Sequence, residues 1–77
     1  MKEFKIGSEV CWSGSWGRDV GRPANLEYIE QTENEHEKDG VEVDSVKWIN
    51  GQWEFPFVCG LDNGHWAYSY QIKPYGV

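Results

Sequence analysis

Basic side chains are scarce in this sequence. Its 77 residues hold seven Lys and Arg against thirteen Asp and Glu, so the net charge is −6 with neutral histidines. The few cations are scattered and form no run. A nucleic-acid binder ordinarily uses a basic stripe to displace counterions, so this charge disfavours nucleic acids and anionic membrane surfaces as partners.

Long hydrophobic runs and cysteine pairs are missing as well. The longest apolar run, residues 55–59, is far shorter than the ~20 residues of a membrane span. Residues 1–6 contain no hydrophobic region of a signal peptide, which predicts a cytoplasmic protein with Cys11 and Cys59 as reduced thiols. The two cysteines form no close pair of the kind that zinc sites use, so we expect no metal and no cofactor.

Catalytic motifs are also missing. The sequence shows no Ser-His-Asp or Cys-His signature, and the glycine-rich residues 14–17 lack the lysine of a phosphate-binding loop. Asp62 and His65 lie three positions apart across a turn, a spacing more typical of local turn hydrogen bonds than of catalysis. We therefore expect no catalytic residues and a protein that is not an enzyme.

Aromatic residues, in contrast, are abundant. Five Trp, four Tyr and three Phe make up 16% of the chain. Each large ring can bury roughly 150–250 Å², so a single domain over residues 1–77 can build a core without disulfides. The inward-facing rings expected from the alternation of apolar residues are Phe4, Trp12, Trp48, Phe55 and Phe57, with Cys59 beside them as a small apolar side chain.

Alternation with period two predicts strands rather than helices. The ranges are 4–12, a second strand beginning at residue 24, 41–48 with a bulge at 44–45, 53–61, and 66–72 with Trp66, Tyr68, Tyr70 and Ile72 on one face. Asn50-Gly51 is a strong signal for a two-residue hairpin turn. Five short strands in so small a chain favour a closed barrel, which removes most exposed edges.

Three stretches resemble the SH3-like small barrels of the Tudor and KOW kind. They are residues 6–10 (Ile-Gly-Ser-Glu-Val), residues 22–29 (Arg-Pro-Ala-Asn-Leu-Glu-Tyr-Ile) and residues 61–74, from the Leu-Asp-Asn-Gly turn to the closing Ile-Lys-Pro. The resemblance implies an all-β, five-stranded SH3-like barrel with a long glycine-rich first loop and an acidic loop between strands two and three. Residues 12–17 and 61–68 also loosely resemble small uncharacterised proteins of phages and mobile elements.

Tudor relatives often bind methylated Lys or Arg in an aromatic cage through cation–π attraction. Trp16 lies in the first loop, where such families often place one ring of the cage. Arg22 replaces the ring often found before Pro-Ala, and Cys59, Leu61 and Asp62 stand where rings near the late turn are expected. The sequence therefore departs from the family cage, while another aromatic surface stays open.

The candidate partner-binding residues are the aromatic and basic side chains in loops, in turns or near the chain end: Trp16, Arg18, Trp53, Tyr68 and Tyr75. Exposed Trp and Tyr are enriched in binding hot spots. For Trp16 two interpretations stay open, because a loop tryptophan can contact a partner or fold back as a plug over the barrel end.

The acidic segment supplies a second candidate surface. Glu33, Glu35, Glu37 and Asp39 alternate with polar residues and leave nothing to bury, which predicts a solvated loop. Its carboxylates could also form an acidic rim that steers a basic partner. A calcium loop would need more oxygen ligands at set spacing than Asp39-Gly40 provides.

These features favour a non-enzymatic binding module for a protein or peptide of basic character, either monomeric or a weak homodimer formed by strand addition. The first alternative is a phage-type inhibitor that mimics nucleic acid with its acidic surface. The second is a binder of a small ligand or nucleotide, stacked on rings at the barrel end.

Overall fold

The computed structural model describes residues 2–14 and 20–75, and this part of the chain is all-β with no α-helix. The strands are β1 (Lys2–Lys5), β2 (Glu9–Trp12), β3 (Arg22–Gln31), β4 (Val41–Val43), β5 (Ser45–Ile49), β6 (Gln52–Trp53), β7 (Phe57–Leu61), β8 (Trp66–Tyr68) and β9 (Ile72–Pro74). One 3₁₀ turn, η1 (Ser69–Gln71), connects β8 to β9. The prediction of an all-β fold is confirmed. No described helix is long and apolar enough to cross a membrane.

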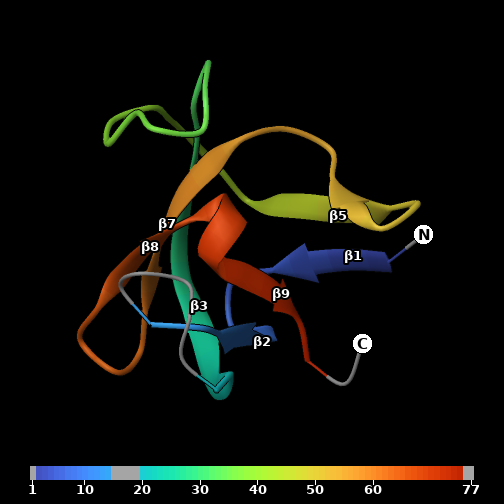
Figure 1. The fold of residues 1–77 in the computed structure, drawn as a ribbon. Helices are drawn as coiled ribbons and strands as arrows, with labels where there is room; N and C mark the ends of the chain where they lie inside the picture. Colours follow the sequence, from blue (N-terminus) through green and yellow to red (C-terminus); the bar gives the residue numbers. More distant parts are fainter. Residues whose placement is uncertain (1, 15–19, 76–77) are drawn as a thin grey trace.

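The strands form two antiparallel sheets around a shared interior (Figure 1). One sheet has the order β1-β5-β6, and the other has the order β8-β7-β3-β2-β9 with β4 paired to β3. Neither sheet closes on itself, so a continuous five-stranded barrel is not what the hydrogen bonding forms. The second sheet nevertheless curls strongly, because its two edge strands β8 and β9 are joined by the single turn of η1.

The first predicted strand, 4–12, is divided into β1 and β2. Gly7 turns the chain with a φ of +93°, a backbone conformation that residues other than glycine rarely adopt. Its N–H donates to the Leu26 carbonyl at 2.7 Å, and the Ser8 N–H donates back to the Lys5 carbonyl at 2.9 Å. Ile6 is 46% exposed, whereas an uninterrupted strand over residues 4–12 would place it on the same face as Phe4 and Trp12.

The third and fourth predicted strands are also interrupted. The expected irregularity at residues 44–45 appears as a break at Asp44 between β4 and β5. The range 53–61 is divided because residues 54–56, which include Pro56, separate β6 from β7. The hairpin turn between β5 and β6 is confirmed, since Asn50 and Gly51 have φ values of 51° and 82°, as a type I′ turn requires.

The last predicted strand contains η1, which changes which side chains face inward. Ala67 and Ile72 are buried, whereas Trp66 and Tyr70 are 47% and 49% exposed. The expectation that residues 66, 68, 70 and 72 share one face is therefore wrong. A 3₁₀ turn repeats every three residues, so the period of two stops at Tyr68.

The core lies between the two sheets. Its buried members are Phe4, Val10, Trp12, Ala24, Leu26, Ile29, Val46, Phe57, Cys59, Leu61, Ala67 and Ile72. The predicted core positions of Phe4, Trp12, Phe57 and Cys59 are confirmed. Trp48 and Phe55 are only half-buried and pack against this core from its edge, together with Trp53 and Val43.

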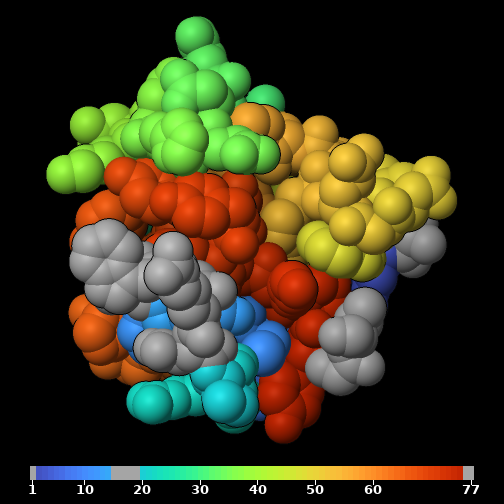
Figure 2. Space-filling model, in the orientation of Figure 1, coloured from blue at the N-terminus to red at the C-terminus, as the bar shows by residue number. Residues whose placement is uncertain are grey.

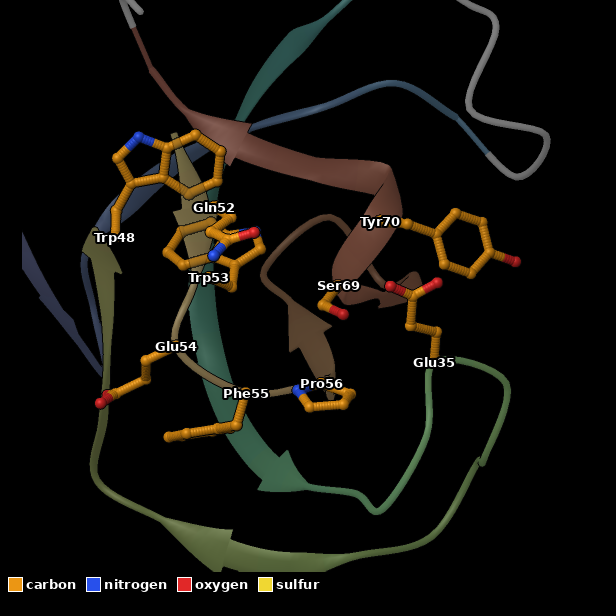
Figure 3. Close-up of a pocket in the computed structure, with 9 residues that line it drawn as sticks. All are labelled: Glu35, Trp48, Gln52, Trp53, Glu54, Phe55, Pro56, Ser69 and Tyr70. Atoms are coloured by element: carbon orange, nitrogen blue, oxygen red, sulfur yellow. The ribbon is translucent and has the colours of Figure 1, made fainter. Parts of the chain in front are cut away.

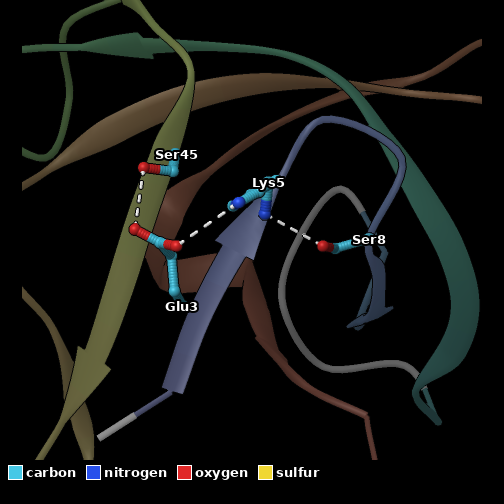
Figure 4. Close-up of polar contacts among 4 residues, drawn as sticks. All are labelled: Glu3, Lys5, Ser8 and Ser45. Atoms are coloured by element: carbon cyan, nitrogen blue, oxygen red, sulfur yellow. Dashed lines mark hydrogen bonds and ion pairs between the residues drawn. The ribbon is translucent and has the colours of Figure 1, made fainter.

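Polar contacts tie the end of β1 to the turn that follows it and to β5 (Figure 4). The Lys5 N–H donates to Ser8 Oγ at 2.9 Å, and the Ser45 hydroxyl donates to Glu3 Oε2 at 3.4 Å. Lys5 Nζ lies 3.8 Å from Glu3 Oε1, an exposed ion pair that stabilises little by itself.

Candidate functional site

A cavity of about 340 Å³ opens between the β5-β6 hairpin, the segment before β7 and η1. We call it the aromatic groove. Its apolar walls are Trp48, Trp53, Phe55, Pro56 and Tyr70, and its polar lining is Glu35, Gln52, Glu54 and Ser69 (Figure 3). The groove thus combines rings from three separate segments of the chain with a carboxylate from the acidic loop.

The β5-β6 hairpin positions the two tryptophans. Trp48 and Trp53 are cross-strand partners, with ring centroids 4.8 Å apart and an interplanar angle of 74°. Trp53 Nε1 donates to the Ile72 carbonyl at 2.9 Å, and its ring meets Phe4 and Phe57 edge to face at 5.3 and 5.2 Å. Trp53 is therefore a fixed, half-buried wall of the groove.

The bend between β6 and β7 completes the apolar side. Phe55 packs edge to face on Phe57, with centroids 6.5 Å apart. The neighbouring Glu54 is turned away, because its Oε1 accepts a hydrogen bond from the Lys47 N–H at 2.8 Å. Figure 3 shows this carboxylate directed away from the rings. The Glu54 carboxylate is thus hydrogen-bonded to the backbone of β5.

Glu35 is the carboxylate that faces the groove. Figure 3 shows its oxygens beside Ser69 and near Tyr70. Glu35 is solvent-exposed, and no ion pair joins it to a cation among the residues that the structure describes. The open end of an aromatic cavity therefore carries a negative charge that no described side chain neutralises.

The acidic loop, residues 32–40, is anchored at its base. The Thr32 N–H donates to the Pro56 carbonyl at 3.0 Å, and its hydroxyl donates to the Asn34 carbonyl at 2.7 Å. The Gly40 N–H donates to Glu30 Oε1 at 3.3 Å. Thr32 is only 6% exposed, so the expectation of a loop with nothing to bury is wrong at this position.

Three rings follow the chain from β8 into η1, with the outer two exposed and the middle one half-buried, and we call them the aromatic row: Trp66, Tyr68 and Tyr70. Tyr68 and Tyr70 stack with centroids 5.4 Å apart and an interplanar angle of 10°. Trp66 meets Tyr68 edge to face at 5.2 Å. Tyr70 belongs to both this row and the groove.

The structure brings two of the predicted site residues together, Trp53 and Glu35. Tyr68 is half-buried and lies beside the groove through its stack on Tyr70. Tyr75 is 50% exposed and lines a separate hollow next to β1. The acidic loop keeps Glu33, Glu37 and Asp39 outside the groove lining, while Trp16 and Arg18 lie outside the described residues.

Sequence reasoning missed Trp48, Phe55, Pro56 and Tyr70 as groove residues. The Asn50-Gly51 turn could have identified Trp48, because a two-residue hairpin loop places Trp48 opposite Trp53. Tyr70 carried no such signal, since its exposure depends on a 3₁₀ turn that the alternation of apolar residues does not reveal.

The titratable side chains Cys59, Asp62 and His65 have contacts outside the groove. Burial raises the pKa of the Cys59 thiol to about 12, although a backbone hydrogen bond at Ala67 opposes the shift. Asp62 Oδ1 accepts from the Asn25 N–H at 3.0 Å, and the His65 ring packs on Trp12 with centroids 4.6 Å apart. Within the described ranges, no group of three or more His, Cys, Asp and Glu could hold a metal ion.

Comparison with protein-family models, curated proteins and solved structures finds no match to this chain.

Proposed function

We propose that this protein is a non-enzymatic binding module that holds a protein or peptide of basic character in the aromatic groove. The observation that carries this proposal is the unneutralised Glu35 carboxylate at the open end of a cavity walled by Trp48, Trp53 and Tyr70. A Lys or Arg side chain would place its stem on the rings and its charge at Glu35.

The chemistry of the groove suits a cation better than a neutral ligand. A cation over an aromatic face gains about 0.5–1 kcal/mol at exposed sites and about 2 kcal/mol where water is excluded. A carboxylate within reach adds a charge-assisted hydrogen bond. The net charge of −6 would also speed the approach of a basic partner and repel an acidic one.

For the fold we propose a partly open SH3-like barrel. The support is the curled five-strand path β8-β7-β3-β2-β9, whose two ends are joined by the single turn of η1. The β1-β5-β6 sheet covers the remaining side of the core (Figure 1). This arrangement leaves the groove at the edge where the two sheets part.

The test compares two variants that remove the same charge from the same loop. Glu35→Gln removes the groove carboxylate, and Glu33→Gln is its matched control outside the groove. The probes are short peptides that contain Lys or Arg, with peptides that carry Gln at those positions as the comparison.

We expect basic peptides to bind the parent and the Glu33→Gln variant with similar affinity. The Glu35→Gln variant should bind them roughly fivefold or more weakly, which corresponds to the loss of about 1 kcal/mol from one cation contact. Equal weakening by both variants would show that only total charge matters and would overturn the groove as the site.

A further inference from the structure

The acidic loop packs against the aromatic row through two of its side chains. The His36 ring centroid lies 5.7 Å from that of Tyr70 and 6.5 Å from that of Tyr68, with interplanar angles of 62° and 72°. Lys38 Nζ lies 5.9 Å from the centroid of Trp66. Figure 2 shows the atoms of this loop, in green, resting against the red segment around η1. The loop is thus held on β8 and η1 as well as at its base.

His36 connects this contact to the groove. It immediately follows Glu35, and its ring packs on Tyr70, which is also a groove wall. Its backbone N–H donates to Asn34 Oδ1 at 2.9 Å, and Asn34 Nδ2 donates to Glu37 Oε1 at 2.5 Å. These bonds close the tip of the loop around Glu35, and the His36 ring is the side chain next to Glu35 that contacts a wall of the groove.

We propose that His36 is the positioning residue of the aromatic groove, whose ring keeps Glu35 at the open end before any ligand binds. This inference rests on the function proposed above. Edge-to-face ring pairs are favourable beyond the area that they bury. A carboxylate already held in place spares the ligand the entropy cost of ordering the loop, so the anchored loop should bind more tightly than a free one.

Three variants separate the aromatic ring of His36 from its nitrogen atoms and from the general effect of losing a histidine. His36→Ala removes the ring, whereas His36→Phe keeps a ring that can pack edge to face on Tyr70. His65→Ala is the control, because the other histidine packs on Trp12 and lies outside the groove lining. Thermal unfolding of all three checks that the fold is kept.

The first measurement needs no ligand. A glutamate-specific protease should cleave the His36→Ala variant after Glu33, Glu35 or Glu37 several-fold faster than the parent, with the cut sites identified by mass spectrometry. His36→Phe and His65→Ala should be cleaved at the parental rate. Parental cleavage of His36→Ala would overturn the anchoring role.

The second measurement is peptide affinity, with the Lys- and Arg-containing peptides as probes. His36→Ala should raise Kd roughly three- to tenfold, and His36→Phe should restore it to the parental value. If Glu35→Gln weakens binding while His36→Ala leaves it unchanged, this inference fails and the proposed function stands. If neither variant changes the affinity, the proposed function fails together with it.

Discussion

Among single residues, Phe4, Phe57 and Trp53 show one way in which aromatic side chains divide between the core and the groove. Phe4 and Phe57 are almost fully buried because they have no polar atom to satisfy. Trp53 stays at the edge of the core, where its Nε1 reaches the Ile72 carbonyl. Trp53 therefore both lines the groove and joins β6 to β9.

Cys59 gives a prediction about alkaline pH. Its pKa is raised to about 12 in the folded protein, whereas an unfolded thiol ionises near pH 9. The unfolded state therefore loses this proton first, and the free energy of unfolding should fall between pH 9 and about pH 12 by roughly 1 kcal/mol per pH unit. Urea unfolding across this range should show a steep decline.

The variant Cys59→Ala should show a shallower decline over the same range. A smaller slope should persist, because burial and the nearby Glu30 also raise the pKa of the Tyr28 phenol. An identical slope in the parent and in Cys59→Ala would contradict the assignment to this thiol.

Gly60 and Tyr28 form a pair whose coupling can be measured. They are cross-strand neighbours in β7 and β3, and a Cβ built on Gly60 would meet the ring of Tyr28. Gly60→Ala should therefore cost about 1–3 kcal/mol of stability through overpacking. The cost should be smaller when Tyr28 is also replaced by Ala, as a double-mutant cycle by urea unfolding would show. Equal costs in both backgrounds would rule out the ring as the cause.

At the scale of strands and turns, the sequence predicts paired strands better than their interruptions. The Asn50-Gly51 turn is encoded by two adjacent residues, so a local pattern is sufficient to identify it. The split at Gly7 depends instead on hydrogen bonding to Leu26, a residue on another strand. The side of the chain that faces the core changes after Tyr68 because of η1, a turn that the alternation of apolar and polar residues does not reveal.

The hairpin turn also gives a prediction at this scale. Gly51 has a φ of +82°, and a Cβ at this position would meet no other atom within 4 Å. Gly51→Ala should therefore lower the free energy of unfolding by about 1 kcal/mol through backbone strain alone. Gly51→Asn should cost less, since asparagine tolerates this region better. Equal losses for both variants by urea unfolding would contradict a purely conformational origin.

Over the whole molecule, the candidate site depends on proximity between distant segments. The groove unites residue 35, residue 48, residues 52–56 and residues 69–70. Composition pointed to its two ingredients, aromatic rings and carboxylates, and the groove lining includes two of the named candidates, Trp53 and Glu35. Composition could not predict that these residues lie together, because the loop reaches η1 through contacts such as those of His36 with Tyr68 and Tyr70.

The same arrangement predicts which tyrosine matters for binding. Tyr70→Ala removes a wall of the groove, whereas Tyr75→Ala removes a comparably exposed ring from a separate hollow. Tyr70→Ala should weaken the binding of Lys- and Arg-containing peptides by roughly three- to thirtyfold, the range of one lost cation–π contact. Fluorescence anisotropy of labelled peptides would measure this. A larger loss in Tyr75→Ala would place the site elsewhere.

The most direct test of the central claim is an NMR titration of the nitrogen-labelled protein with arginine-rich and lysine-rich peptides, with glutamate-rich peptides as the control. We expect saturable shifts of the Trp48 and Trp53 indole N–H signals and of the Tyr70 amide, with a midpoint that moves to roughly fivefold higher peptide concentration or more in Glu35→Gln and is unchanged in Glu33→Gln. Shifts confined to Trp66 or Tyr75, or groove shifts whose midpoint is the same in Glu35→Gln as in the parent, would contradict this binding site.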